Sequence, residues 1–402
     1  MLCCSCLAAP KLVEQRAAEI RTVLREADDA YYNLGEPIMA NEAYDALRSQ
    51  YQSLKTEYPD LPAYSSVGAA VPEQENPAAH TQPVLSLKKA YSDEGVVEFI
   101  EACGADRIYC VEPKIDGLTV VLRYREGRLL QALTRGDGIT GSDVTAQVRA
   151  SGAVPLALTN APTRLDVRGE LYMPFAAFEA LNEQRVADGE AELKSPRNTA
   201  AGTLRMKDLA AVAKRGLAYA VFEVLESEPM PTTHADALAM AQSCGLTPVA
   251  HQLLSGSNAV HAVALMNQRR AELPYPSDGV VIRLNDCAEF ERMGATARWP
   301  NGALARKYKS VPVETHLRRV DWTTGETGRL TPVAGFDPVT MDGAELKRAS
   351  LHSLSHLRAL DLMIGDRIQV IRAGGAVPEI IGRVPGSRTG DEQPIPDPDE
   401  NP

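Results

Sequence analysis

Residues 112–117 read Glu-Pro-Lys-Ile-Asp-Gly, and a run of strand-forming residues, Leu118-Thr-Val-Val-Leu-Arg-Tyr124, follows them directly. Side chains alternate between the two faces of a strand, so we expect Glu112, Lys114 and Asp116 to share one face. That face would hold an amine between two carboxylates. A lysine amine attacks an electrophile only in its neutral form, which requires burial or nearby positive charge. The stretch therefore predicts a strand that carries a candidate nucleophile.

The Lys-x-Asp-Gly pattern is typical of covalent nucleotidyl transfer, in which a lysine attacks the phosphate of an adenylyl or guanylyl group. Its three fixed positions are expected by chance in roughly one chain of this length in ten. On its own, the pattern is equally compatible with a charged pair on a solvated strand. If it is functional, we expect Gly117 to let the backbone approach a nucleotide closely.

Further motifs follow the same order as in a known family. They are Ser86-Leu87, Thr134-Arg-Gly-Asp-Gly138, Val167-Arg-Gly-Glu-Leu-Tyr172, Ser195-Pro-Arg-Asn-Thr-Ala-Ala-Gly-Thr-Leu-Arg205, Asp278-Gly-Val-Val-Ile-Arg283 and Ala305-Arg-Lys-Tyr-Lys309. In this order and spacing the set closely resembles the adenylation domain of bacterial NAD-dependent DNA ligases. The resemblance runs from about residue 31 to about residue 378. ATP-dependent ligases and capping enzymes share Lys-x-Asp-Gly but would not be expected to carry Pro-Arg-Asn-x-Ala-Ala-Gly.

The chain divides into segments with different patterns. Residues 11–58 show helical periodicity interrupted by a loop at 33–40, and residues 59–84 are rich in Pro, Ala and Ser. Strand-like runs and helices alternate over residues 85–311, and short strands with Gly turns follow to about residue 384. We expect strands at 108–124, 129–133, 164–173, 218–225 and 279–284, helices at 175–187 and 234–244, and further strands at 318–323, 329–336 and 367–372.

These patterns predict an α+β protein. With the resemblance, they imply a helical domain and linker at 1–68 that binds the nicotinamide mononucleotide (NMN) half of NAD. A mixed α+β nucleotidyltransferase (ATP-grasp-like ligase) domain follows at 69–311, then an OB-fold barrel at 312–386 and a disordered, Pro- and Asp-rich tail at 387–402. Family members usually continue with a four-cysteine zinc module, helix-hairpin-helix repeats and a BRCT domain. The sequence shows none of these, so we expect a minimal form.

Composition and charge restrict the class of protein further. The 402 residues are 44% hydrophobic and 24% charged, which is ordinary for a soluble globular protein of two or three domains. No apolar stretch approaches the length of a membrane span, and the seven irregularly spaced cysteines favour a reducing compartment. We therefore expect a cytoplasmic protein, a monomer, with no membrane association and no metal site.

A net charge of −11 is unusual for a DNA-binding protein, which normally presents a basic surface. Lys and Arg nevertheless cluster at 205–215, 306–309, 318–319 and 347–348. For any one cluster taken alone, a solvated face is the favoured interpretation.

The resemblance implies roles for individual residues. Lys114 is the nucleophile, Asp116 assists later steps near the nick, and Arg135, Arg283 and Lys307 surround the phosphate. Glu112 and Glu170 match acidic positions that contact adenine and ribose, and Phe222 occupies the place of an aromatic residue that stacks on adenine, although core packing is an equal alternative. The other implied residues are Ser86 and Leu87 for the nucleotide, Tyr31, Asn41, Tyr44 and Asp45 for nicotinamide, and Arg197, Arg205 and Arg270 for phosphates of DNA or nucleotide.

The sequence departs from the family pattern at several of these places. Arg283 stands where lysine is usual, Asn41 where aspartate is usual and Tyr32 where histidine is usual. Lys88 replaces an aspartate, and Glu326 replaces an arginine in the Gly-x-Thr-Gly turn of the expected barrel, which should weaken DNA contact there.

The resemblance implies an NAD-dependent DNA ligase that seals nicks in duplex DNA through a Lys114–AMP intermediate, with Mg²⁺ implied by the chemistry rather than by a ligand motif. Two alternatives remain at this point. One is an ATP-using ligase or capping-type nucleotidyltransferase, and the other is a non-sealing protein that binds nicks.

Overall fold

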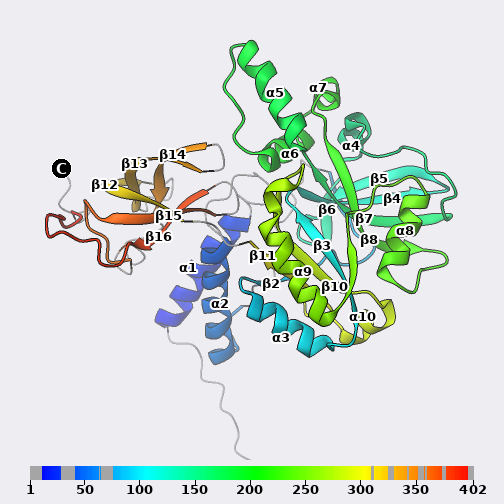
Figure 1. Cartoon of the computed structure of the whole chain (residues 1–402), viewed down its shortest axis with the longest axis horizontal. Helices are drawn as coiled ribbons and strands as arrows, with labels where there is room; N and C mark the ends of the chain where they lie inside the picture. The colour runs from blue at the N-terminus through cyan, green and yellow to red at the C-terminus, as the bar shows by residue number, and fades with distance from the viewer. Residues whose placement is uncertain are drawn as a thin grey trace, which may run out of the picture. The chain divides into compact units, whose positions relative to one another are not determined.

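The computed structural model describes residues 11–28, 41–62, 64, 76–308, 312–324, 330–341, 344–351, 357, 360–373 and 377–396. It contains two compact units, of which one holds residues 64–309 and the other holds the N-terminal helices and the C-terminal barrel. Helices and sheets are mixed throughout, so the predicted α+β class is confirmed (Figure 1).

Two antiparallel-rich sheets form the larger unit. The first has the strand order β2-β11-β10-β3-β9 and consists of β2 (Lys88–Ala90), β3 (Ile108–Ile115), β9 (Gln252–Ser255), β10 (Ser277–Leu284) and β11 (Ala303–Lys307). The second has the order β5-β4-β7-β8 and consists of β4 (Leu118–Arg125), β5 (Arg128–Thr134), β7 (Arg164–Tyr172) and β8 (Ala218–Ser227). A short pair, β1 (Pro77–Ala79) and β6 (Thr140–Ser142), completes the strands of this unit.

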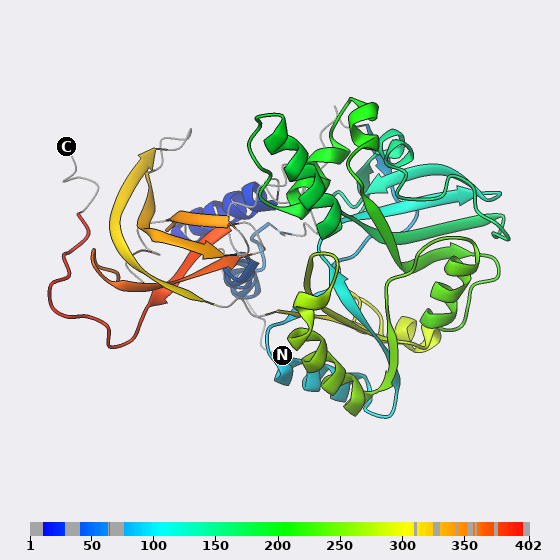
Figure 2. The same ribbon diagram turned by 45° about the horizontal axis from the view of Figure 1, so that its top comes forward.

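Helices cover the outer faces of both sheets. The helices α3 (Asp93–Cys103) and α9 (Gly256–Gln268) lie side by side against the first sheet, where Phe99 and Val263 pack with Val111 and Ile282 (Figures 1 and 2). The second sheet packs against α4 (Thr145–Ser151), α6 (Pro196–Leu204) and α8 (His234–Ser243). The remaining helices are α5 (Phe175–Ala187), α7 (Leu209–Ala213), α10 (Cys287–Met293) and the 3₁₀ turn η3 (Arg270–Glu272).

The expected strand at 108–124 is wrong in one respect, because it is two strands. β3 ends at Ile115 and β4 begins at Leu118, and the two strands belong to different sheets. Asp116 therefore lies in the crossing between the sheets, where its backbone N–H donates to the carbonyl of Pro276 at 2.8 Å. The Lys-x-Asp-Gly stretch thus connects the two sheets and does not continue along one face.

The N-terminal helices follow the expected periodicity. α1 spans Lys11–Asp28 and buries Ala17, Ile20 and Leu24, which are all 1% exposed or less. α2 spans Asn41–Glu57 and buries Tyr51, whose hydroxyl donates to the carbonyl of Pro62 at 2.5 Å. The loop expected at 33–40 lies outside the described residues.

The C-terminal segment forms a five-stranded antiparallel sheet in the order β14-β13-β12-β15-β16. Its strands are β12 (Val313–Thr324), β13 (Leu330–Met341), β14 (Ala344–Ser350), β15 (Arg367–Ala373) and β16 (Val377–Arg383). The first part of β12 pairs with β15 and the rest pairs with β13, so this long strand turns the sheet around a common core. That core includes Leu317, Ala334, Ile368 and Val370. A barrel of short antiparallel strands was the expectation for this region.

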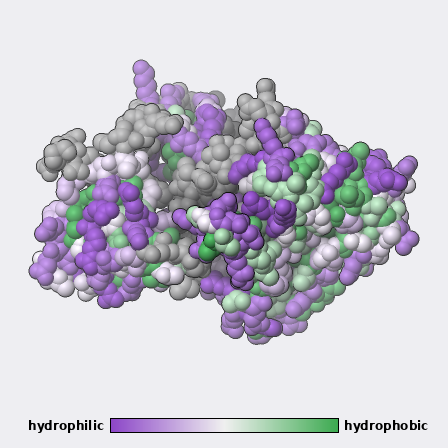
Figure 3. All heavy atoms as spheres, turned by 90° about the horizontal axis from the view of Figure 1, so that it is seen from above, coloured by the Kyte–Doolittle hydropathy of each residue, from purple (hydrophilic) through white to green (hydrophobic). Residues whose placement is uncertain are grey.

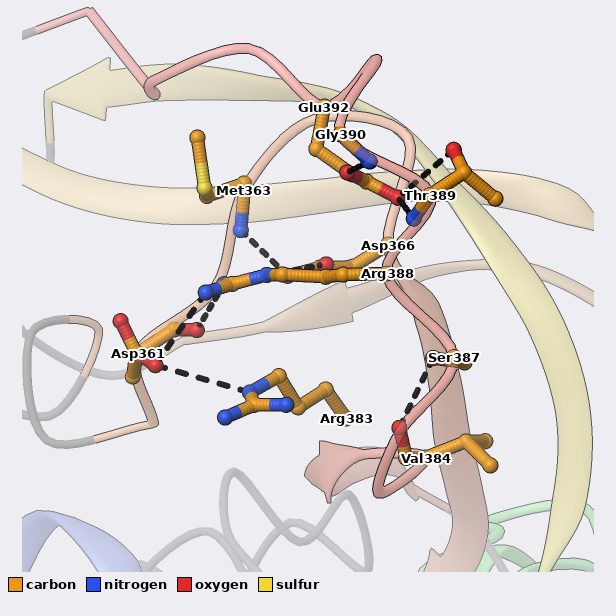
Figure 4. A network of polar contacts seen from close by, with 10 residues as sticks. All are labelled: Asp361, Met363, Asp366, Arg383, Val384, Ser387, Arg388, Thr389, Gly390 and Glu392. Carbon is orange, nitrogen blue, oxygen red and sulfur yellow. Dashed lines mark hydrogen bonds and ion pairs between the residues drawn. The ribbon is translucent and has the colours of Figure 1, made fainter.

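The prediction that residues 387–402 are disordered is wrong as far as residue 396. Arg388 pairs with the buried carboxylate of Asp366 through two nitrogens, at 2.8 and 2.9 Å, and the backbone N–H groups of Thr389 and Gly390 donate to Glu392 (Figure 4). The Pro- and Asp-rich composition suggested disorder, but Arg388 of this tail binds the buried Asp366 carboxylate of the barrel. The remaining tail residues, 397–402, lie outside the described part.

The surface agrees with the ordinary composition. On the face drawn in Figure 3, hydrophilic residues are interspersed with hydrophobic ones. No helix in the described residues is long and apolar enough to cross a membrane.

Candidate functional site

Lys114 and Lys307 share one carboxylate. The Nζ of Lys114 lies 3.1 Å from Oδ1 of Asp278, and the amine of Lys307 donates to Oδ2 of the same side chain. Register explains the meeting, because Lys114 on β3 and Lys307 on β11 are both aligned with Gly279 on β10, directly after Asp278. Three strands of one sheet therefore fix two amines around one acid.

The ionisation of this cluster follows from burial and mutual charge. Burial lowers the pKa of Lys307 to about 8, with the positive charge of Lys114 acting in the same direction and Asp278 opposing both. Burial would raise the pKa of Asp278, but the two lysines outweigh burial and hold that pKa well below its usual range. Asp278 is thus an anion, and two amines compete for its single charge.

Arg197 reaches this cluster from a helix that its own sequence caps. Ser195 is the N-cap of α6 and its side chain accepts from the N–H of Asn198 at 3.4 Å, while Pro196 occupies the first helical position. The next residue, Arg197, forms an ion pair with the Asp116 carboxylate. The Ser-Pro-Arg-Asn motif therefore holds an arginine against the residue two positions after Lys114.

Glu170 closes the site on the side of the second sheet. Its Oε1 accepts from the N–H of Gly117 at 3.2 Å and its Oε2 accepts from the hydroxyl of Thr119 at 3.0 Å. Burial raises the pKa of Glu170, and the charges of Lys114 and Arg197 only partly counter this effect. Glu170 is therefore within electrostatic reach of the candidate nucleophile.

Packing between strands gives a second reason for glycine at position 117. A Cβ at this position would lie 2.2 Å from the carbonyl oxygen of Leu171 and 2.9 Å from Cβ of Tyr172. No side chain fits there, because β4 starts against the backbone of β7. Strand packing alone requires this glycine, so its presence does not by itself indicate a nucleotide.

A second charged cluster lies on the strands of the other sheet and on β10. Glu223 pairs with Arg168 at 2.8 Å and with Arg283 at 2.6 Å, and the two arginines hold the pKa of Glu223 at about 2 against the opposing effect of burial. The Arg283 guanidinium also stacks on the ring of Phe290, 3.8 Å from its centroid. Arg283 was expected at the phosphate with Lys307, but in the structure its contacts are with Glu223 and Phe290.

Arg168 joins this cluster to the predicted residue Phe222 and to the segment that immediately precedes Ser86. Its guanidinium lies 5.3 Å from the centroid of the half-buried Phe222 ring, and its Nη1 donates to the carbonyl of Leu85 at 3.2 Å. The loop that carries Ser86 and Leu87 is thereby tied to β7. These contacts bring Phe222 and the Ser86–Leu87 loop to the same arginine.

Glu112 is buried with two donors. The Nε2 of His234 lies 2.8 Å from Oε1 of Glu112, and the thiol of Cys110 donates to the same oxygen at 3.3 Å. In the part of the chain that the structure describes, this is the one place where three potential metal-ligating groups come within 4.8 Å of one another. The hydrogen bonds account for the grouping, and burial together with the charge of Glu112 raises the pKa of Cys110, which keeps the thiol protonated.

The other predicted residues are more dispersed. Arg135 is half-buried, and its charge contributes to lowering the pKa of Arg168 after the larger effect of burial. Arg270 is exposed and lies over the ring of Tyr308 at 5.5 Å, whereas Arg205 is exposed at the C-terminus of α6. Arg306, from one of the basic clusters, is buried in an ion pair with Asp93 at 2.9 Å and so contributes no basic surface.

Tyr44 is the predicted nicotinamide residue whose side chain lies in the described part of the structure. Its hydroxyl accepts from Arg48 at 3.3 Å, and the Arg48 guanidinium lies 5.6 Å from the centre of its ring. Tyr31 lies outside the described residues, as do the side chains of Asn41 and Asp45. Tyr44 thus already interacts with a cation of its own helix.

Sequence reasoning missed several members of the two clusters. Asp278 appeared only as part of a motif, while Glu223, His234 and Lys89 were not singled out, although the charge of Lys89 also lowers the pKa of Lys307. A signal existed for Asp278, because it is an acid at the start of the apolar run Val280-Val-Ile282. His234 carried no such signal at the N-terminus of an ordinary amphipathic helix.

The arrangement suits a nucleoside phosphate. Lys114, Lys307 and Arg197 bring three cations to one place, where they can stabilise the charge of an incoming phosphate. A half-buried aromatic ring, Phe222 on β8 of the second sheet, and a buried acid, Glu112 on β3 of the first sheet, are side chains of the kinds that bind a base. The carboxylates near Lys114, namely Asp116, Glu170 and Asp278, are oxygen donors of the kind that Mg²⁺ prefers.

Family models match the chain in three consecutive segments. The N-terminal NAD⁺-binding domain of DNA ligase-like proteins matches residues 10–67, and the NAD-dependent DNA ligase adenylation domain matches residues 73–311. The NAD-dependent DNA ligase OB-fold domain matches residues 314–392. The OB-fold expectation is therefore confirmed, and the match includes most of the ordered part of the tail.

Proteins named DNA ligase are similar along almost the whole chain. The one from Syntrophomonas wolfei is 38% identical over 402 residues, covering 97% of this chain and 60% of the relative. Those from Petrotoga mobilis and Heliobacterium modesticaldum are 35% and 37% identical, covering 98% and 96% of this chain and 60% and 59% of the relatives. The chain thus spans about three-fifths of the length of these curated relatives.

The adenylation-domain match alone covers more than half of the chain. All residues of the two charged clusters lie within this match. The order of the three matched segments is also the order expected from the motifs. The chain belongs to the family of NAD-dependent DNA ligases.

Proposed function

We propose that this protein seals nicks in duplex DNA with NAD as the source of an adenylyl group. The observation that supports this proposal most directly is the contact of Lys114 with Asp278, beside Lys307. An amine held by an anion and flanked by a second cation is oriented toward a phosphate rather than left free in solvent. NAD is consumed as a substrate in this proposal.

The proposed first step is self-adenylation. The neutral amine of Lys114 attacks the α-phosphate of the AMP half of NAD, so that a P–N bond forms and the bond to nicotinamide mononucleotide breaks. AMP then passes from Lys114 to the 5′-phosphate of a nick, and the 3′-hydroxyl displaces AMP to close the strand. Transfer of a phosphoryl-type group depends mainly on positioning and charge stabilisation.

The chain's own residues divide this work. Lys307 and Arg197 stabilise charge on the phosphate, and Asp278 orients the two amines, since its low pKa makes it a weak base. Asp116 is held by Arg197 and becomes available for the nick when that ion pair opens. Glu170 and Glu112 contact ribose and adenine in this scheme.

Two further components belong to the proposal. The NMN half of NAD is held by the N-terminal helical segment through Tyr31, Asn41, Tyr44 and Asp45. Mg²⁺, bound by phosphates and by carboxylates such as Asp116, would neutralise charge that develops on the phosphates.

Nicked duplex DNA is the proposed partner, bound by a monomer in the cytoplasm. Exposed arginines on the barrel are already paired within the protein: Arg318 with Asp337, and Arg319 and Arg348 with Asp321. Together with a net charge of −11, these pairs predict weak binding to DNA.

One assay separates this proposal from its alternatives. The protein is incubated with nicked duplex and either NAD or ATP, and both sealed product and the covalent AMP adduct are measured. We expect both signals with NAD and neither with ATP. Activity with ATP would favour an ATP-using nucleotidyltransferase, and DNA binding without an adduct would favour a non-sealing nick-binding protein.

A further inference from the structure

Glu112 is an acid that the protein orients from one side. Its side chain is 5% exposed, and among the described residues both hydrogen bonds to its carboxylate converge on Oε1. His234 approaches at 2.8 Å from the first turn of α8, and Cys110 approaches at 3.3 Å from the same strand as Glu112. These hydrogen bonds leave Oε2 as the oxygen available to accept from a ligand.

His234 itself is fixed by its helix terminus. Thr233 is the N-cap, with its hydroxyl oxygen accepting from the N–H of Asp236 at 3.1 Å. The backbone N–H of His234 donates to the carbonyl of Asn285 at 2.7 Å, which ties the start of α8 to the end of β10. The imidazole is 3% exposed, so it has little freedom to leave Glu112.

The Glu112–His234 pair lies at the end of the site away from Lys307. The charge of His234 contributes to lowering the pKa of Glu223, after the larger effects of Arg168 and Arg283, so the imidazole is close to that cluster. Glu223 follows Phe222 directly, and Arg168 contacts both. Glu112, through His234, is thus close to the cluster whose Arg168 contacts the aromatic ring proposed to stack on the base.

We propose that His234 is a positioning residue that fixes the Glu112 carboxylate for recognition of the adenine 6-amino group, and so sets the preference for adenine over 6-oxopurines. This inference rests on the proposed function only in taking a purine nucleotide as the ligand. An ionised carboxylate only accepts hydrogen bonds, so it accepts from the 6-amino group and repels a 6-oxo group. Holding Oε1 with two donors keeps Oε2 directed at position 6.

The test compares AMP with IMP, which differ at this edge of the base, by calorimetric titration of the full chain. We expect the wild-type protein to bind AMP at least about tenfold more tightly than IMP, in line with one charge-assisted hydrogen bond. His234→Leu should lower this ratio about tenfold, whereas His234→Gln, whose amide can donate to Oε1, should retain most of it. His251→Leu, a half-buried histidine outside both clusters, is the matched control and should leave the ratio unchanged.

A double-mutant cycle distinguishes positioning from general damage. If His234 acts through Glu112, then adding His234→Leu to Glu112→Gln should cause no further loss of the ratio. The inference is overturned if folded His234→Leu weakens AMP and IMP by the same factor, or if it leaves the ratio intact. Should His234→Leu fail to fold, His234→Asn, whose shorter amide does not reach Oε1, serves the same purpose, and an unchanged ratio there is equally contradictory.

The result also separates this inference from the proposed function. A wild-type protein that prefers AMP but forms no Lys114–AMP adduct with NAD contradicts the function and supports the inference. A wild-type protein that forms the adduct but binds AMP and IMP equally supports the function and overturns the inference.

Discussion

The amine of Lys114 lies 3.1 Å from the carboxylate of Asp278, although the two residues are 164 positions apart in the sequence. Antiparallel pairing of β3 with β10 produces this contact, and the shared carboxylate also binds Lys307. The charge balance of the site therefore depends on one acid, which makes its variants informative.

Replacing Lys114 should abolish self-adenylation. Lys114→Ala removes the amine, and Lys114→Arg replaces it with a guanidinium that stays protonated and does not attack phosphate. Intact mass after incubation with NAD should show no AMP adduct for either variant. An adduct of unchanged yield in either one would assign the nucleophile to another residue.

The rate of self-adenylation should fall as pH rises above about 8. Burial lowers the pKa of Lys307 to about 8, so its stabilising positive charge is present below that pH and is lost above it. Asp278 raises this pKa, so Asp278→Asn should move the alkaline fall to lower pH. The rate of adduct formation in a single turnover, measured from about pH 6 to about pH 10, gives the shift. An identical alkaline fall of the rate in both proteins would contradict the assignment.

Removal of residues 313–402 should eliminate nick sealing while leaving self-adenylation intact. The residues of the two charged clusters all precede residue 311, and we propose that the barrel contacts DNA in the later steps. For the full chain, few phosphate contacts should give a shallow slope of log affinity against log salt, about −3 to −5. Normal sealing by the truncated protein would leave the barrel without a role in the reaction.

The N-terminal helices should determine the choice of NAD. Asn41 lacks the negative charge expected opposite the cationic nicotinamide ring, so KM for NAD should be raised and Asn41→Asp should lower it. Tyr44→Ala should impair adenylation from NAD, since a cation–π contact contributes about 0.5–2 kcal/mol. Asp45→Ala should do the same, by removing a carboxylate.

These N-terminal variants carry an internal control. Sealing of a pre-adenylated nick does not need nicotinamide, so Tyr44→Ala and Asp45→Ala should leave that step largely intact. Adenylation by ATP at the rate seen with NAD, or unchanged NAD adenylation after deletion of residues 1–60, would refute the assignment of this segment.

The ordered tail should contribute to the stability of the barrel. Arg388→Ala removes the two hydrogen bonds that Arg388 donates to the fully buried Asp366 and leaves this carboxylate without its cation, so thermal unfolding should begin at a lower temperature. Arg388→Lys keeps the charge but loses the two-nitrogen geometry and should be intermediate. Equal melting temperatures for the three proteins would show that the tail does not contribute to the stability of the barrel.

Local sequence patterns predicted the helices and strands whose hydrophobic periodicity is clear. The helix expected at 175–187 is α5 (Phe175–Ala187), and the strand expected at 164–173 is β7 (Arg164–Tyr172). The helix α6 was missed because its interior Thr and Gly residues weaken the helical pattern, although Ser195 and Pro196 formed a helix-start signal. The separation of β3 from β4 was missed because both are rich in strand formers, and only the sheet topology distinguishes them.

Site residues that belong to a recognisable motif were predictable from the sequence. Contacts that only the tertiary fold brings together were not. Lys114, Lys307 and Glu170 stand in recognisable motifs, and the charge of Lys114 affects the pKa of each of the other two. The pairing of Glu112 with His234 joins residues 122 positions apart through a helix terminus, which no local pattern reveals. Arg283 bears the expected charge, but Glu223 and Phe290 determine where that charge lies.

The steric position of Gly117 affects how a mutational scan of this protein would be interpreted. Any side chain at Gly117 collides with the backbone of Leu171, so a substitution there disturbs the junction of two sheets before it reaches the reaction. An inactive Gly117→Ala variant would therefore report a misassembled scaffold, even though it lies inside the most diagnostic hexapeptide of the chain. Measurements of folding must accompany activity at this position, whereas at Lys114, whose side chain is 27% exposed, loss of activity can be attributed to chemistry.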